Sequence, residues 1–300
     1  MFAKTGSRIV NGWALGREAF ALMKQHPKLV VFPILSGLSF LGILAGIVTG
    51  AFLRPDLFGI DVTHGSNGSF SASGTYVSLI WGFGLYFVLA FIGTFFNTAL
   101  CGTILARHLT GRVSLLDGLA AAFRRLPQIL AWTFVAATVG IILAQVKEWL
   151  DKYLSWFGWI FGSLLETAWA ATVYFVAPIL AVEGVGPITA LKRSASLLKS
   201  RWGETAGAEF STTWALWPLH LFGLVSLLGM LFTGSFATGA TLAGSMLAFS
   251  VAFALYLLVA VVLHSIMSGV IKSHLYLYAT TGETPVGSDP AVYARAFGKT

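Results

Sequence analysis

The chain has 300 residues, a formal net charge of +7 and a mean hydropathy of +0.80; 56% of its residues are hydrophobic and only 10% are charged. Soluble globular domains carry about 25% charged residues, so this composition excludes an ordinary soluble enzyme or a basic nucleic-acid-binding domain. One cysteine, Cys101, excludes an internal disulfide framework. Uncharged runs of about 20 residues recur, and each is long enough to cross a bilayer as a helix.

Six apolar stretches predict an all-α polytopic membrane protein with six transmembrane helices. The expected spans cover residues 29–53, 77–105, 126–146, 158–182, 205–232 and 243–271. They form one membrane domain over residues 1–280, and residues 281–300 are expected to be a cytoplasmic tail. The last two spans come from one long apolar stretch, which the Gly- and Thr-rich sequence TGSFATGAT at residues 233–241 divides with a turn.

The basic residues predict the orientation of the chain. All but three of the 19 Lys and Arg residues fall in segments that share a side with the two termini, and the exceptions are Arg54, Lys147 and Lys152. Lys and Arg are concentrated in cytoplasmic loops. We therefore expect a bacterial inner (cytoplasmic) membrane protein with cytoplasmic N- and C-termini.

Three amphipathic stretches are expected to be cytoplasmic interfacial helices: WALGREAFALMKQHP (13–27), VSLLDGLAAAFRRLP (113–127) and PITALKRSASLLKSRW (187–202). Each carries four apolar residues at helical spacing. These residues are Trp13, Gly16, Phe20 and Met23; Val113, Leu116, Ala120 and Phe123; and Ile188, Leu191, Ala195 and Leu198. Aligning Pro27, Pro127 and Trp202 brings the three stripes into register. The hypothesis that follows is three repeated units, each made of one surface helix and two spans.

The basic faces of these helices have two interpretations: they anchor the bundle, or they form a platform for anionic lipid or a partner protein. In the alignment a basic residue comes three positions before each anchor, at Lys24, Arg124 and Lys199. The expected contacts with anionic headgroups are Lys24, Arg124, Arg125, Lys192, Arg193, Lys199 and Arg201. Glu183, at the head of the third stretch, is expected to pair with Arg193 or with another surface helix.

A family resemblance rests on three segments, YFVAPILAVEGVGPITALKRSASLLKSRWGE (174–204), FFNTALCGTILARHLTGRVSLLDGLAAAFRRL (95–126) and LYLYATTGETP (275–285). With these the chain resembles a family of uncharacterised bacterial six-span membrane proteins. Its ALKRS and KSRW motifs also resemble, more distantly, the membrane domain associated with some glycerophosphoryl diester phosphodiesterases. The resemblance implies a six-helix membrane domain and brings no catalytic residues, because the soluble phosphodiesterase barrel has no counterpart here.

The candidate intramembrane polar site consists of Glu166, His264, His220 and Asn97. An ionisable side chain at membrane depth costs free energy unless it is paired, neutral or in contact with water, so such a residue is a candidate functional site by default. Glu166 is the strongest candidate. It is a proton or cation site, a protonated carboxyl bonded to a neighbouring helix, or, if the span begins near Trp159, a residue that lies higher in the membrane. The histidines and Asn97 are expected chiefly to bond across helices. Their spacing does not resemble a metal motif, and we expect no metal or cofactor.

Gly42, Gly46 and Gly50 form a ridge of small residues on the first span, which predicts close approach by another helix, either in this chain or in a second copy. Whether the chain forms a homo-oligomer or binds a membrane-protein partner therefore stays open, and no nucleic-acid partner is expected. No catalytic constellation is present, so the chain is not expected to be an enzyme. The sequence favours a non-enzymatic scaffold or lipid-interacting accessory protein. The alternative is a transporter or channel that uses Glu166.

Overall fold

The computed structural model describes residues 14, 16–53, 72–154, 156–199, 216–236, 239–291 and 293, and in this part of the chain the regular structure is entirely helical. The predicted all-α class is therefore confirmed. Five helices are long and apolar enough to cross a membrane: Pro27–Gly50, Trp81–Thr110, Leu126–Leu154, Phe157–Val182 and Gly244–Thr281. The fifth expected span lies partly outside the described residues, and its described part holds a shorter apolar helix, Trp217–Gly229. The count of six spans stays a prediction.

The chain groups into two compact units. Unit 1 comprises Met1–Pro33, Thr103–Leu115 and Leu197–Thr300, and unit 2 comprises Ile34–Gly102 and Leu116–Ser196. Two long helices, α2 (Val31–Leu53) and α3 (Ala72–Thr110), contribute to both units.

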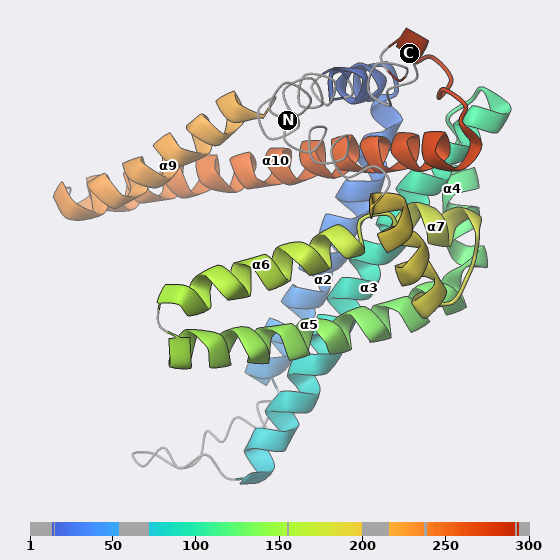
Figure 1. The fold of residues 1–300 in the computed structure, drawn as a ribbon. Helices are drawn as coiled ribbons and strands as arrows, with labels where there is room; N and C mark the ends of the chain where they lie inside the picture. Colours follow the sequence, from blue (N-terminus) through green and yellow to red (C-terminus); the bar gives the residue numbers. More distant parts are fainter. Residues whose placement is uncertain are drawn as a thin grey trace. The chain divides into compact units, whose positions relative to one another are not determined.

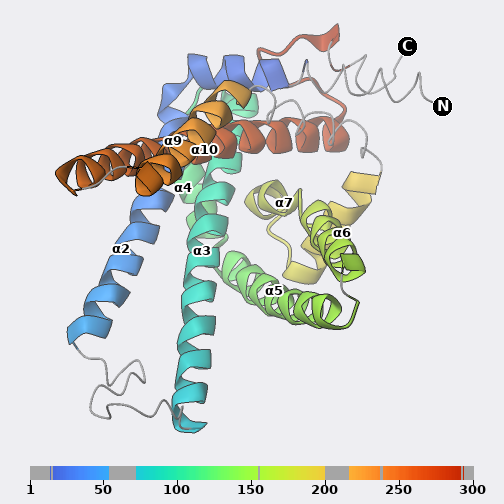
Figure 2. The ribbon, with the colours of Figure 1, turned by 90° about the vertical axis from the view of Figure 1, so that its left-hand side faces the viewer.

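Unit 1 is built around a helical hairpin of α9 (Trp217–Phe236) and α10 (Gly239–Thr281), which lie side by side in Figures 1 and 2. Gly223 and Gly229 make this packing close, because a Cβ at either position would overlap the ring of Tyr256 or Phe249. The 3-10 turn η1 (Pro27–Val30) also contacts α10, and a short helix at residues 16–25 precedes it.

The hairpin of unit 1 differs from expectation at both ends. The expected turn at residues 233–241 is much shorter, since α9 continues to Phe236 and α10 begins at Gly239. In a membrane the backbone groups must be satisfied within the chain, which favours helix even through Gly and Thr. At its other end α10 continues ten residues past the expected boundary and stops at Thr281, where Gly282 follows with a φ of 75°.

Unit 2 contains a second antiparallel pair, α5 (Leu126–Leu154) and α6 (Trp156–Thr172), visible as neighbours in both ribbon views. The unit also includes α4 (Leu115–Arg124), from Leu116 onward. Aromatic rings join α3 to α5 and α4: Phe83 and Phe134 have ring centroids 6.1 Å apart, and Phe95 and Phe123 5.0 Å apart. These ring pairs join the helices through partly exposed contacts, because Phe134 and Phe123 are 56% and 62% exposed.

The expected fourth span is interrupted. After α6 ends at Thr172 the chain makes a turn, and α7 (Val176–Val182) continues. The backbone N–H of Phe175 donates to the Ser194 hydroxyl at 3.0 Å, so the helix at residues 187–199 satisfies a backbone donor that the break frees. Beyond α7, Arg125 donates to the Val182 carbonyl at 3.1 Å.

Two residues of the expected glycine ridge on α2 have open space around them. A Cβ added at Gly42 or Gly46 would meet no atom within 4 Å. The close helix approach expected along Gly42, Gly46 and Gly50 stays a prediction.

The three short helices expected at the surface are present at residues 16–25, 115–124 and 187–199. Their buried faces agree with the expected stripes only in part, since Met23 and Leu198 are buried as expected. Leu116 and Phe123 are 78% and 62% exposed, whereas Ala122 is fully buried. An interfacial helix would present such uncovered apolar side chains to lipid, and the interfacial position of these helices stays a prediction.

Candidate functional site: a polar cluster at the helix ends

Glu166 lies on the α5/α6 pair, where Lys147 Nζ approaches its Oε1 to 2.8 Å. Both side chains are partly exposed, Glu166 by 52% and Lys147 by 33%. The carboxylate is thus held by a cation from the neighbouring helix. This contact gives Glu166 a partner on the neighbouring helix, and the role of Glu166 stays a prediction.

The other residues of the expected intramembrane site have separate environments. His220 Nδ1 lies 3.1 Å from the Tyr256 hydroxyl, an interhelical hydrogen bond between α9 and α10. Asn97 Oδ1 accepts a weak contact from the Cys101 thiol at 3.8 Å within α3, and His264 is exposed on α10. No hydrogen bond or ion pair within the described ranges joins Glu166, His264, His220 or Asn97 to one another.

The basic residues expected to contact lipid divide into two groups. Arg125 and Arg193 have partners inside unit 2: Arg125 donates to Val182, and Arg193 Nε lies 3.3 Å from Glu183 Oε1. This confirms the expected pairing of Glu183 with Arg193. The remaining described members are exposed, namely Lys24, Arg124, Lys192 and Lys199. Arg201 lies outside the described residues.

The most concentrated group of polar side chains in the described chain was not expected from the sequence. It lies in unit 1, where the helix at residues 16–25, the end of α3, the end of α10 and the segment after α10 supply one residue or more each. We call it the polar cluster, and it consists of Glu18, Arg107, His108, His274, Glu283 and Tyr293.

Arg107, near the end of α3, is 9% exposed and donates from Nη1 to the Val286 carbonyl at 2.7 Å. The next residue, Gly287, has a φ of 82°, and a Cβ there would lie 2.9 Å from Arg107 Nη2. Glycine is therefore required twice, by the left-handed backbone and by the close approach of the guanidinium.

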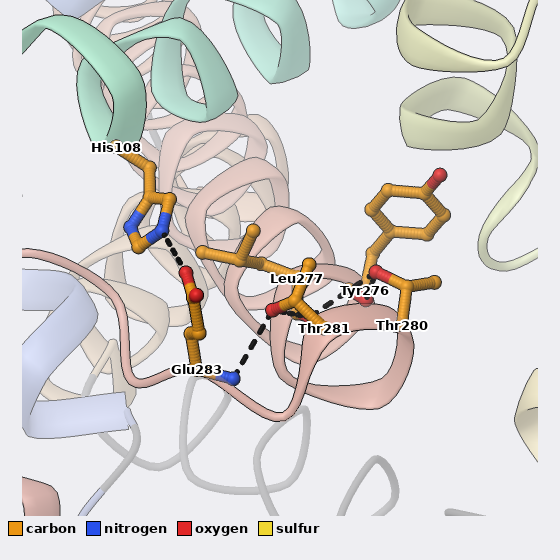
Figure 3. Close-up of polar contacts among 6 residues, drawn as sticks. All are labelled: His108, Tyr276, Leu277, Thr280, Thr281 and Glu283. Carbon is orange, nitrogen blue, oxygen red and sulfur yellow. Dashed lines mark hydrogen bonds and ion pairs between the residues drawn. The ribbon is translucent and has the colours of Figure 1, made fainter.

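The neighbouring His108 pairs with Glu283, with Nε2 and Oε2 2.9 Å apart (Figure 3). The end of α10 places this carboxylate. Gly282 turns the chain in the left-handed region, and its N–H donates to the Tyr278 carbonyl at 3.0 Å. The Thr281 hydroxyl donates to the Leu277 carbonyl at 2.9 Å and accepts from the Glu283 N–H at 3.1 Å. The TTGE sequence thus ends the helix and orients the acid.

The rest of the cluster links the N-terminal helix to the segment after α10. Glu18 Oε1 accepts the Asp289 N–H at 3.0 Å, while Glu18 Oε2 is buried with no hydrogen-bond partner among the described residues. Tyr293, 1% exposed, places its hydroxyl 3.0 Å from Nδ1 of His274, which is itself 6% exposed. Tyr293 also hydrogen-bonds to Glu18. A carboxyl, a phenol and an imidazole therefore form one continuous chain.

Burial sets the protonation of this chain. Desolvation raises the pKa of Glu18 above its ordinary 4.5, and the nearby Asp289 charge adds to the rise, although hydrogen bonds from Asp289 and Ser288 oppose it. Desolvation likewise raises the pKa of the Tyr293 phenol above 10.0. At His26, burial and then the Arg107 charge lower the pKa of the imidazole. These shifts favour neutral forms of the three groups.

Chemically, the polar cluster can hold and exchange protons. In the part of the chain that the structure describes, no group of three or more His, Cys, Asp or Glu side chains is arranged to hold a metal ion. Sequence reasoning missed the cluster because its partners are 175, 179 and 271 residues apart along the chain. The one available signal was the gathering of His and Arg within a few residues of the span ends.

Comparison with known proteins places residues 75–286 in a family of unknown function, DUF6159. No curated protein matches the chain. The matched residues include Arg107, His108, His274 and Glu283 of the polar cluster, while Glu18 and Tyr293 lie outside the match. The likeness to a phosphodiesterase-associated membrane domain stays a prediction. The match covers well over half of the chain, and the protein therefore belongs to the DUF6159 family of unknown function.

Proposed function

We propose that this protein is a non-enzymatic multi-pass membrane protein, a scaffold or accessory protein that holds anionic lipid headgroups at its cytoplasmic surface. The proposal includes a bacterial inner-membrane location with both termini in the cytoplasm. One observation carries it. The aligned basic residues of the three short helices, Lys24, Arg124 and Lys199, are all exposed, and none has a carboxylate partner among the residues that the structure describes.

The contrast with the other basic side chains strengthens this inference. Arg107 and Arg125 are bonded to backbone carbonyls, and Lys147 and Arg193 are paired with Glu166 and Glu183. The short helices instead direct their cations outward. Arg124 bonds only to the Ala120 carbonyl of its own helix at 3.3 Å, and Lys24 Nζ lies 4.6 Å from the centroid of the Phe20 ring.

Electrostatic attraction to an anionic leaflet is worth about 1 kcal/mol for each basic residue near the surface. Three or four unpaired cations would therefore favour anionic over zwitterionic lipid by several kcal/mol, provided that the helices lie at headgroup level. This attraction does not need a closed pocket, and it falls with added salt because the charges are exposed.

Lipid retention tests the proposal. Native mass spectrometry of the purified protein, after exchange into mixed phosphatidylglycerol and phosphatidylcholine, should show preferential retention of phosphatidylglycerol. Lys192→Ala and Lys199→Ala should each reduce that preference, and Lys24→Ala/Arg124→Ala/Lys199→Ala should reduce it further.

The matched control is Lys152→Ala, which removes an exposed lysine from the end of α5, on the opposite side in the predicted topology. In the same experiment, this variant should retain phosphatidylglycerol at the wild-type level. Equal loss in Lys152→Ala and Lys192→Ala, or unchanged retention in the triple variant, would contradict the proposal.

The alternative, a transporter or channel using Glu166, has less support. It requires a carboxyl that is accessible to a permeating ion or proton inside the bundle. Lys147 already neutralises Glu166 at 2.8 Å, on a partly exposed face of the α5/α6 pair. Proton or cation flux that depends on Glu166 in reconstituted vesicles would favour this alternative over the lipid-binding proposal.

A further inference from the structure

We propose that residues 282–291, together with Tyr293, form a proton-dependent latch, which is closed when Glu18 is protonated and opens when Glu18 loses its proton. This regulation goes beyond lipid binding and does not depend on it. The latch would connect the protonation state of the cytoplasmic end of unit 1 to the position of the segment that follows α10.

The closed latch is held at four points. Glu283 pairs with His108, the Val286 carbonyl accepts from Arg107, and Tyr293 bonds to His274. The fourth point is Glu18 Oε1, which accepts the Asp289 N–H. Together with the side-chain hydrogen bonds of Glu18 to Ser288 and Tyr293, this contact ties the latch to the N-terminal helix, so movement of Glu18 would release the C-terminal half of the segment.

Glu18 is poorly placed to keep a negative charge. The C-terminal segment presents Asp289, Ser288 and Tyr293 to it, and one of these is a second acid. The other charged or titratable groups of the cluster are engaged elsewhere: Arg107 with Val286, His108 with Glu283 and His274 with Tyr293. His26 lies beside Arg107 and favours its neutral form. Glu18 therefore has no described cation as a partner.

The unpaired Oε2 of Glu18 also disfavours the ionised form of the carboxyl. A buried carboxylate oxygen without a partner costs free energy when ionised, whereas a protonated oxygen at this atom carries no net charge. With Oε1 still accepting from the Asp289 N–H, the neutral acid keeps the latch contact. The ionised acid gains by moving to water, which breaks that contact.

Linkage gives the sign of the effect. The closed state raises the pKa of Glu18 above 4.5, so closure is fully favoured below pH 4.5 and is lost as the pH rises through the higher value. Opening releases one proton. Between pH 4.5 and the higher pKa of Glu18 in the closed state, the equilibrium constant for opening should increase by up to about tenfold per pH unit. Outside this pH range, the equilibrium constant should not change with pH.

Hydrogen exchange measured by mass spectrometry on the full-length protein in detergent tests the latch. Protection factors of a peptide covering residues 286–291, corrected for intrinsic exchange, should fall as the pH rises from 4.5 to about 8. In Glu18→Gln, which keeps an acceptor and cannot ionise, protection should be independent of pH. The matched control is Glu183→Gln in unit 2, which should retain the wild-type pH dependence.

Asp289→Asn provides a second variant. It keeps a side-chain oxygen to accept the Ala291 N–H, which Asp289 Oδ1 accepts at 2.8 Å, but it removes the charge beside Glu18. Its pH dependence should be smaller than that of the wild type. The latch would be overturned by wild-type protection that does not change with pH, or by the same pH dependence in Glu18→Gln as in the wild type.

Discussion

Gly184 illustrates how a single residue supports the turn that follows α7. It follows α7 with a φ of 61°, and a Cβ there would overlap the Arg125 guanidinium. Gly184→Ala should therefore destabilise the protein by about 1–3 kcal/mol, through left-handed backbone strain and loss of the Arg125 bond to Val182. Unfolding by SDS titration, followed by circular dichroism, would measure this loss.

Gly186→Ala is the control for this substitution, two residues away. Gly186 has no atom within 4 Å of an added Cβ and is not in the left-handed region. Its replacement should change the unfolding free energy by less than about 0.5 kcal/mol. Equal losses at the two positions would show that the Arg125 contact does not stabilise this turn.

The buried phenol of Tyr293 should make the stability of the protein depend on pH in the alkaline range. Its pKa is raised by burial, so the stability that the neutral phenol contributes is present below pH 10.0 and is lost as the pH rises through the folded value. Alkaline unfolding should therefore be steeper in the wild type than in Tyr293→Phe. At neutral pH the Phe variant should lose about 1 kcal/mol, from the missing bond to His274.

Tyr153→Phe is the matched control, because Tyr153 is 61% exposed. Its alkaline unfolding profile should match that of the wild type. A Tyr293→Phe variant that unfolds with the wild-type profile above pH 10.0 would argue against a buried, hydrogen-bonded phenol at this position.

Some residue contacts were predictable and others were not. Glu183 and Arg193 are ten residues apart, and their opposite charges in one polar stretch made this ion pair one of two expected pairings of Glu183. Glu18 and Asp289 are 271 residues apart. Helical periodicity reports only local neighbours, so no pattern in the sequence could place the N-terminal helix against the segment after α10.

At the scale of elements, the helix at residues 187–199 stabilises the break between α6 and α7. Ser194 is fully buried, and its hydroxyl accepts the Phe175 N–H at 3.0 Å. Ser194→Ala should cost about 1–3 kcal/mol, because a buried N–H loses its partner. The control Ser196→Ala, at an exposed position two residues later, should have little effect in the same SDS titration. Similar losses for both serines would contradict this account of the break.

The three short helices show how far an element can be predicted. Their existence and their exposed basic residues followed from hydrophobic spacing and charge. Their buried faces followed only in part. Met23 and Leu198 of the expected stripes are buried, whereas Leu116 and Phe123 are exposed. Leu22, Ala122 and Leu197, which stand five residues before the three anchors of the alignment, are also buried. Apolar stripes alone do not distinguish a face that packs on protein from one that meets lipid. The threefold repeat stays a hypothesis.

For the whole molecule, composition was sufficient to predict an all-helical chain with helices long enough to span a membrane, and five helices meet that criterion. Helix ends were less predictable. α10 continues to Thr281 because Gly282 and the Thr281 cap, rather than the loss of apolar residues, terminate it. The functional reasoning from sequence concentrated on Glu166, while the polar cluster, whose members come from both ends of the chain, lies at the helix ends of unit 1.

The account depends on the basic residues of the short helices facing the cytoplasm, and cysteine accessibility tests this most directly. The native thiol, Cys101, is buried and should not react with the reagent, so labelling of single introduced cysteines can be measured without it. Lys24→Cys, Arg124→Cys and Lys199→Cys should react with a membrane-impermeant maleimide only in inside-out vesicles. Lys152→Cys should react only in right-side-out vesicles. Labelling of any of the first three from the same side as Lys152→Cys would contradict the proposed topology and the lipid-binding surface.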